Sequence, residues 1–256
     1  NLAIIGGSLL SDMSSMLTNI KRERIKTPFG EPSDAFITGY LNDTAVVYLN
    51  RHGHQHHIAP HQINYRANIF ALKVLDVSHI IAVTAVGGIT HKMSPMTWVI
   101  PDQLIDYSYG RMQTYNDANQ HVVKHIDFTV PFNAGLREVL MEAAGGAGIN
   151  CVCSATYGVT QGPRLETAAE IKRMENDGCD IVGMTAMPET SLSREIDIDY
   201  ATISLVVNWA AGKDEGIVSM DSIRQRIREG DNIISDIIEK AIERLSDGDL
   251  PDRSAR

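Results

Sequence analysis

The chain has 256 residues, of which 43% are hydrophobic and 21% are charged, an ordinary balance for a globular protein. That length allows one large α/β domain or two small ones with a core of useful size. The formal net charge of -9 excludes an extended basic face for nucleic acid, although a local basic pocket can still hold an anionic substrate.

The three cysteines, Cys151, Cys153 and Cys179, match neither a disulfide framework nor the spacing of a tetrahedral zinc site. We expect free, buried or half-buried thiols, which suit a reducing cytoplasm. No apolar run reaches the length of a membrane span, and we recognise no signal peptide. The expectation is therefore a cytoplasmic protein without a membrane or nucleic-acid partner.

Short apolar runs alternate with longer amphipathic ones, which is typical of an α/β fold. We predict strands over residues 2–5, 34–40, 44–49, 79–85, 152–160, 180–184 and 201–208, with a turn at Asn42-Asp43. We predict helices over residues 64–75, 133–144, 166–176 and 221–245, the last with Asp221 as its N-cap. Residues 1–245 are expected to form one domain, followed by a polar, frayed tail over residues 246–256.

Small or polar residues follow several of these strands, and ligands bind beyond the carboxyl ends of strands in open α/β sheets. Gly6-Gly7-Ser8 follows the first strand. Its glycines let backbone N–H groups approach an anion, and Ser8 adds a hydroxyl donor. Alone, the pattern is equally typical of a tight turn, and it is not the GxGxxG of a dinucleotide site.

A denser cluster, Arg51-His52-Gly53-His54-Gln55-His56-His57, follows a later strand. Arg51 can grip two phosphate oxygens with the planar fork of its guanidinium, and His52 can donate a further hydrogen bond. The histidines could instead bind a metal, but no acidic ligand is interleaved. An Arg-His-Gly after a strand also occurs in histidine phosphatases, usually on the first strand, whereas two or three strands precede it here.

Thr84, Ala85 and Thr185 stand at two further predicted strand ends and add hydroxyl and backbone donors that, with Arg51, would surround one phosphate. Glu166 is either a helix-start acid stabilised by the dipole or a carboxylate that binds a ring N–H. Asn208 carries a donor and an acceptor, so it can read the edge of a base.

In combination, these motifs resemble the trimeric purine nucleoside phosphorylase and methylthioadenosine phosphorylase family. The likeness extends from Ile4 to about Ile223, and its closest fit is to the bacterial S-methyl-5′-thioinosine phosphorylases. The residues that carry it are Gly6-Gly7-Ser8, Arg51-His52-Gly53, Asn64-Tyr65-Arg66-Ala67-Asn68, Gly162-Pro163-Arg164, Glu166-Thr167, Met184-Thr185 and Pro188-Glu189.

The resemblance implies a mixed sheet wrapped by helices and a homotrimer with active sites near the subunit interfaces. It implies phosphate binding by Ser8, Arg51, His52, Thr84, Ala85 and Thr185. It places Met184 against the ribose, with Leu165 also at the substrate, and His125 near the 5′ group in a neighbouring subunit's site. One departure from the family is Leu9, which stands where the family usually has glycine and leaves the detailed shape of that loop open.

Three positions of the resemblance concern the purine base. Adenosine-type relatives carry two aspartates where this chain has Asn208 and Ala210, and a small residue where it has Glu166. A 6-oxopurine offers an N1–H donor that suits a carboxylate and an O6 acceptor that suits an amide. Adenine would set its bare N1 against Glu166 at a cost of about 1–3 kcal/mol. The chain is therefore predicted to prefer 6-oxopurines.

Met220 and Ile223 offer apolar, polarizable contacts that suit a 5′-methylthio group, or they simply pack the final helix. The predicted reaction is phosphorolysis of S-methyl-5′-thioinosine to hypoxanthine and 5-methylthioribose 1-phosphate. Phosphate is the co-substrate, no metal or cofactor takes part, and Asn208, Glu166 and His52 act in catalysis. The alternatives are an inosine, guanosine or methylthioadenosine phosphorylase, a histidine-type phosphatase, and a nucleoside-binding protein without turnover.

Overall fold

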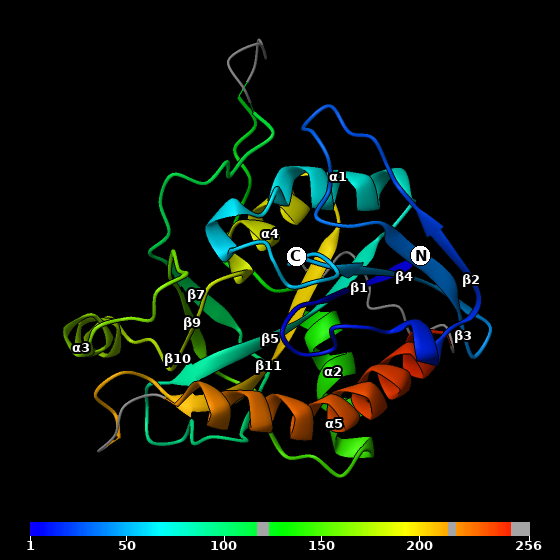
Figure 1. Ribbon diagram of the computed structural model, residues 1–256. Coiled ribbons are helices and arrows are strands. Elements are labelled where there is room, and N and C mark those ends of the chain that lie inside the picture. Colours follow the sequence, from blue (N-terminus) through cyan, green and yellow to red (C-terminus); the bar gives the residue numbers. More distant parts are fainter. Residues whose placement is uncertain (117–122, 215–218, 247–256) are drawn as a thin grey trace.

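The computed structural model describes residues 1–116, 123–214 and 219–246, which form a mixed sheet of 11 strands with helices packed on it (Figure 1). The predicted fold class, an α/β fold with a mixed central sheet flanked by helices, is confirmed. The strands are β1 (Leu2–Gly6), β2 (Thr18–Glu23), β3 (Phe36–Leu41), β4 (Thr44–Asn50), β5 (His79–Gly88), β6 (Trp98–Val99), β7 (Gln103–Asp106), β8 (Cys151–Val152), β9 (Thr156–Val159), β10 (Ile181–Gly183) and β11 (Asp199–Trp209). The helices are α1 (Tyr65–Val74), α2 (Ala134–Gly146), α3 (Ala168–Asn176), α4 (Ala186–Glu195) and α5 (Met220–Ser246), with 3-10 turns at Ser14–Met16 and Pro60–Gln62.

The helices cover the sheet from two sides (Figure 1). Helices α2 and α5 pack on one face and α1 and α4 on the other, so that two apolar clusters sandwich the central strands. Because side chains alternate along a strand, Ile4 of β1 belongs to the first cluster and Ile5 to the second. Helix α3 lies apart from both layers, beside β9 and β10 (Figure 1).

Strand β5 runs through the middle of the sheet and is paired differently along its two edges. β11 accompanies it in parallel from His79 to Gly88 on one edge. On the other edge, β1 pairs in parallel only as far as Ala82, and β10 pairs antiparallel only from Gly87. Among the described strands, none pairs with residues 83–86 on this second edge. The sheet therefore contains an opening that is lined by the backbone of β5.

Most predicted elements lie where the apolar pattern places them. The turn Asn42-Asp43 joins β3 to β4, with both residues at positive φ, as a two-residue hairpin requires. Asn64 and Asn133 cap α1 and α2 with their side chains. Strands β2, β6 and β7 were not predicted, because β2 is an exposed polar edge strand and the other two are short.

Two of the strands differ from the prediction in their boundaries. The strand predicted over 152–160 is two strands, because β8 pairs with β6 and the chain then crosses to place β9 between β7 and β10. Asp102 secures the crossing by accepting hydrogen bonds from Ala155 N and Ser154 Oγ. β5 continues to Gly88, so Thr84 and Ala85 lie within the strand and not at its end.

Two helix starts also differ. Helix α3 begins at Ala168, with Thr167 and Glu170 forming a capping box, so Glu166 precedes the helix and lies in the loop. Helix α5 begins at Met220, which puts Asp221 in its first turn and not at the N-cap. It ends at Ser246, and the rest of the predicted tail, residues 247–256, lies outside the described residues.

Candidate active site

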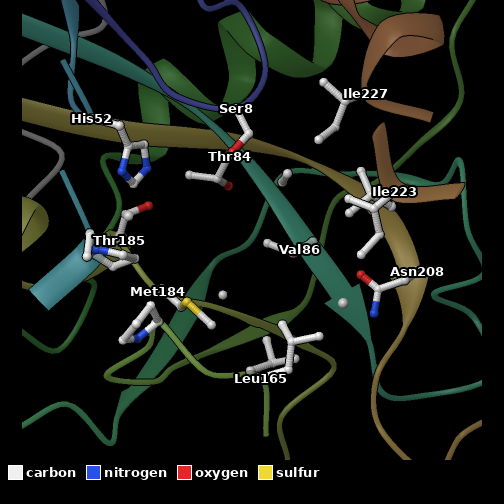
Figure 2. Close-up of a pocket in the computed structure, with 18 of the residues that line it drawn as sticks. Ser8, His52, Thr84, Val86, Leu165, Met184, Thr185, Asn208, Ile223 and Ile227 are labelled. Atoms are coloured by element: carbon white, nitrogen blue, oxygen red, sulfur yellow. The ribbon is translucent and has the colours of Figure 1, made fainter. Parts of the chain in front are cut away.

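A cavity of about 450 Å³ opens beside the unpaired edge of β5 (Figure 2). Loops after β1, β4, β9 and β10, the strands β5 and β11, and the start of α5 all contribute to its wall. All but one of the residues that the sequence analysis singled out line this cavity. They are Ser8, Arg51, His52, Thr84, Ala85, Leu165, Glu166, Met184, Thr185, Asn208, Ala210, Met220 and Ile223.

His125 is the residue that does not line the cavity. Its side chain is exposed, in an irregular segment between β7 and α2. The predicted contact of His125 is with the site of a neighbouring subunit, and the structure contains one chain. That contact stays a prediction.

Arg51 is the largest fully buried side chain among the described residues, with 1% of its surface exposed. Its Nε and Nη2 donate to the two carboxylate oxygens of Glu189 at 2.7 and 3.0 Å, and Nη1 donates to Val83 O at 2.8 Å. Glu189 occupies the Nε–Nη2 edge of the guanidinium, so the expected grip of Arg51 on phosphate stays a prediction and would use the N–H groups left on Nη1 and Nη2.

Gly7 makes room for this arrangement. A Cβ at position 7 would lie 2.8 Å from Nη1 of Arg51, closer than two such atoms can approach. The same Cβ would lie 3.7 Å from Nε2 of His52. The Gly6-Gly7-Ser8 turn thus passes directly over both side chains of the Arg51-His52 pair.

Glu189 is buried to the same degree as Arg51 and also accepts a hydrogen bond from Tyr200 Oη at 2.9 Å. Burial disfavours the charge of Arg51, but the adjacent Glu189 carboxylate holds the Arg51 pKa above its usual value. In the sequence, Glu189 belongs to the Pro188-Glu189 motif, but nothing there indicates its role. The two partners are 138 residues apart, so no local pattern pairs them.

His52 is neutral, and its tautomer is determined by one contact. Its Nδ1 lies 2.9 Å from Ile58 O. Because a carbonyl oxygen can only accept, Nδ1 carries the proton and Nε2 keeps its lone pair. Burial lowers the His52 pKa to about 4. His52 therefore turns an acceptor toward the Gly6-Gly7-Ser8 turn, where the sequence analysis expected a donor.

Hydroxyl groups gather at this end of the cavity, where Figure 2 shows Ser8 and Thr84 close to His52 and Thr185. Thr84 Oγ1 lies 2.7 Å from Ser204 Oγ of β11. Thr185 occupies the N-cap position of α4 but makes no capping hydrogen bond, which leaves its hydroxyl for a ligand. An anion here would meet several donors on a frame of strands.

Figure 2 shows Leu165 and Asn208 at the end of the cavity away from His52, and Glu166, which follows Leu165, also lines the cavity. Glu166 Oε1 accepts from Thr160 Oγ1 at 2.5 Å, and no hydrogen bond to Oε2 is found within the described part of the chain. Asn208 Nδ2 donates to Trp209 O at 2.7 Å, which leaves its second proton and Oδ1 for a ligand. This end therefore offers a carboxylate acceptor beside an amide donor and acceptor.

A β-bulge lets two consecutive residues of β11 reach the cavity. Val206 pairs with Val86 and Asn208 pairs with Gly87, so Val207 is an extra residue in the ladder. In a regular strand, neighbouring side chains point to opposite faces. Here Val207 and Asn208 both line the cavity.

Arg111 is a structural residue of the site that the sequence analysis missed. It is buried and donates to the carbonyl oxygens of Thr160, Gln161, Met184 and Met187. These bonds hold the loop that leads to Glu166 against the loop that carries Met184. Arg111 lies in an irregular segment without a motif, so only the fold reveals its role.

The start of α5 closes the cavity with apolar side chains. Met220 is 53% exposed and Ile223 is nearly buried. Ile227, one turn further along α5, also lines the cavity and was not singled out from the sequence. Its spacing of four residues from Ile223 was the available signal.

We predict that Glu189→Gln lowers the free energy of unfolding by about 3–5 kcal/mol, because it leaves the charge of Arg51 buried without a partner. Urea unfolding measures this change. The matched control is Glu170→Gln, because Glu170 pairs with Arg164 at the surface and glutamine still serves in the capping box. The control should cost about 0–1 kcal/mol. Equal costs for the two variants would contradict the structural importance of the buried pair.

None of the helices in residues 1–116, 123–214 and 219–246 combines the length and the hydrophobicity that a membrane span requires. Within the same residues, no group of three or more His, Cys, Asp or Glu side chains is placed to hold a metal ion.

Comparison with known proteins gives consistent results. The chain is 45% identical over 229 residues to a probable S-methyl-5′-thioinosine phosphorylase of Pseudomonas syringae pv. tomato, covering 89% of this chain and 92% of the relative. It is 44% identical over 216 residues to the 6-oxopurine nucleoside phosphorylase of Pyrococcus furiosus, covering 82% and 80%. A solved methylthioadenosine phosphorylase from an antarctic soil metagenomic library superposes with a TM-score of 0.91 at 36% identity, covering 98% of this chain and 88% of that one. These similarities confirm the resemblance inferred from the motifs, and the chain belongs to the phosphorylase superfamily, whose profile matches residues 1–243.

Proposed function

We propose that this protein is a purine nucleoside phosphorylase that converts S-methyl-5′-thioinosine and phosphate into hypoxanthine and 5-methylthioribose 1-phosphate. One observation carries the proposal: a single cavity joins a hydroxyl-rich end beside Arg51 to an end with Glu166 and Asn208. A nucleoside that spans the cavity would set its glycosidic bond between the two ends. The names of relatives at 40–45% identity support the same reaction class.

Phosphate binds at the end lined by Ser8, Thr84 and Thr185, whose hydroxyls donate to its oxygens. The backbone N–H of Ala85 and the free N–H groups of Arg51 complete the set of donors. His52 contributes an acceptor, because its Nδ1 proton is directed to Ile58 O. His52 can therefore accept a hydrogen bond from the protonated oxygen of hydrogen phosphate. This contact orients the other phosphate oxygens, the nucleophiles, toward the sugar.

Glu166 and Asn208 bind the base. Oε2 of Glu166 accepts the N1–H of a 6-oxopurine, and the amide of Asn208 binds at N7 and O6. As the glycosidic bond breaks, negative charge grows on the purine, and the Asn208 amide stabilises it. Ala210 is buried and apolar, so it supplies no carboxylate for the 6-amino group of adenine.

The sugar lies between these ends, with Met184 and Leu165 against it and Met220 and Ile223 at its 5′ group. Bond cleavage gives an oxocarbenium-like transition state that phosphate captures directly, so no covalent enzyme intermediate and no metal or cofactor is needed. A methylthio group matches the apolar wall of α5 better than a hydroxyl does.

We further propose a homotrimer in which His125 of each subunit reaches a neighbour's 5′ pocket. The exposure of Met220, 53% in the single chain, fits a cavity wall that a second chain completes. The free thiols Cys151, Cys153 and Cys179 fit a cytoplasmic location.

A second candidate is a phosphorylase of inosine or guanosine, favoured by the relative named as a 6-oxopurine nucleoside phosphorylase. It would use the same phosphate and base ends and differ only at the 5′ group. A methylthioadenosine phosphorylase, as in the solved neighbours, fits Glu166 less well because adenine has no N1–H.

The reaction is tested by incubating the protein with S-methyl-5′-thioinosine, with and without phosphate, and measuring free hypoxanthine. We expect release only when phosphate is present. Phosphate-independent release would indicate a hydrolase, and no release would leave a nucleoside-binding protein. Release of phosphate from a monoester would instead support a histidine-type phosphatase.

We predict that Asn208→Asp combined with Glu166→Ser shifts the base preference toward 6-aminopurines. The ratio of kcat/KM for methylthioadenosine to that for methylthioinosine should rise about tenfold or more, because one buried mismatch is removed from adenine and one is imposed on hypoxanthine. Glu170→Gln, a carboxylate on the neighbouring helix that does not line the cavity, should leave the ratio unchanged. An unchanged ratio in the double variant would refute the base assignment.

We also predict that Ile223→Thr lowers kcat/KM for methylthioinosine about tenfold or more while changing that for inosine less, because it removes apolar contact at the 5′ group. Steady-state kinetics with the two substrates measures the difference, and inosine serves as the internal control. If inosine matches methylthioinosine in the unaltered protein, the second candidate replaces the first.

A further inference from the structure

Tyr157 of β9 carries a buried hydroxyl that the proposed reaction does not yet use. The side chain is fully buried, and within the described part of the chain its hydroxyl has no hydrogen-bond partner. Buried tyrosine hydroxyls nearly always have a partner, since an unmade bond in the interior costs stability. Phenylalanine would fill the same space without that cost. The hydroxyl therefore calls for an explanation other than packing.

The fold aims this hydroxyl at the phosphate end. β9 pairs in parallel with β10, so that the ring of Tyr157 reaches the end of β10 at Gly183. A methyl group on Gly183 would overlap the hydroxyl, so glycine at this position clears its path. Gly183 is followed directly by Met184 and Thr185, which line the cavity, whereas Tyr157 itself does not line it.

Thr84 and Thr185 line the cavity and also interact with Tyr157, which does not line it. Burial raises the pKa of Tyr157 to about 12, and interactions with the side chains of Thr84 and Thr185 lower it in part. The hydroxyl thus stays protonated at neutral pH and is a donor. Both threonines are near enough to influence the hydroxyl, although within the described residues it makes no hydrogen bond of normal geometry.

The number of protons on the two threonine hydroxyls indicates what effect a hydrogen bond from Tyr157 would have. A threonine hydroxyl has one proton, and it can give that proton to phosphate while its oxygen accepts another from behind. Thr84 Oγ1 lies 2.7 Å from Ser204 Oγ, and Thr185 makes no capping hydrogen bond that would restrain its hydroxyl. A donor on the side of the threonines away from the cavity occupies their oxygens and so directs their protons toward the cavity. The successive hydrogen bonds of such a chain strengthen one another.

We propose that Tyr157 is a positioning residue of the phosphate site, donating its hydroxyl proton to Thr84 or Thr185 so that these threonines donate theirs to phosphate. The inference rests on the proposed function, since it assumes that phosphate occupies this end of the cavity. The hydrogen bond that Tyr157 lacks forms when phosphate draws the threonine protons to itself.

Tyr157→Phe tests the proposal through the phosphate site alone. We expect the KM for phosphate to rise about fivefold, the size of one hydrogen bond, with little change in kcat or in the KM for the nucleoside. Without phosphate, the melting temperature should equal or exceed that of the unaltered protein. The rise in melting temperature that phosphate produces should be smaller.

A purely structural hydroxyl would behave in the opposite way. Tyr115→Phe is the matched control, because the Tyr115 hydroxyl donates to Arg66 O at 3.0 Å and lies away from the cavity. It should lower the melting temperature without phosphate and leave the KM for phosphate unchanged. If Tyr157→Phe behaves like this control, or like the unaltered protein, the proposal is overturned.

A double-mutant cycle identifies the threonine involved. In a Thr185→Val background, Tyr157→Phe should have no further effect on the KM for phosphate if the proton passes through Thr185, and Thr84→Val tests the other route. Full additivity in both backgrounds would overturn the proposal. If phosphate neither stabilises the unaltered protein nor promotes hypoxanthine release, the proposed function fails and Tyr157 loses its role with it. If the unaltered protein shows both effects, only the role of Tyr157 is at stake.

Discussion

The buried ion pair of Arg51 and Glu189 is the contact on which the architecture of the site depends. A guanidinium with 1% of its surface exposed is tolerable only when its charge and its N–H groups are matched. Glu189 supplies the opposite charge, and Val83 O accepts a hydrogen bond from Nη1. Tyr200 Oη donates a further hydrogen bond to the Glu189 carboxylate. The pair thereby joins the loop after β4 to α4, β5 and β11. The donors around the cavity are positioned by folding, before any ligand arrives.

The sheet provides the space that this pair surrounds. β1 leaves β5 after Ala82 and β10 joins it only at Gly87, so residues 83–86 face an opening and not a neighbouring strand. The antiparallel direction of β10 then brings Met184 and Thr185 back toward Thr84, which parallel pairing would not do. A mixed sheet is thus a requirement of the site as well as a description of the fold.

The sequence predicts many of the strands, helices and cavity residues, and there is a physical reason for each feature that it does not predict. Buried strands, side-chain caps and the hairpin at Asn42-Asp43 follow from local patterns, and strand-end motifs single out residues that prove to share one cavity. The partner of Arg51, the tautomer of His52 and the contacts of Arg111 do not follow from such patterns. Each depends on a carbonyl or carboxylate that another segment brings into place, such as Glu189, 138 residues from Arg51.

The bulge at Val207 joins two walls of the cavity that belong to different elements. Because Val207 is an extra residue, Asn208 keeps its pairing with Gly87 of β5 while both Val207 and Asn208 line the cavity. Arg226 of α5 donates to Val207 O at 2.8 Å, which ties the bulge to the helix that carries Ile223 and Ile227. The backbone that presents Asn208 is therefore mechanically linked to the apolar wall that Ile223 and Ile227 form. A displacement of α5 would reach the backbone beside Asn208 through this hydrogen bond, so the two walls of the cavity are expected to move together.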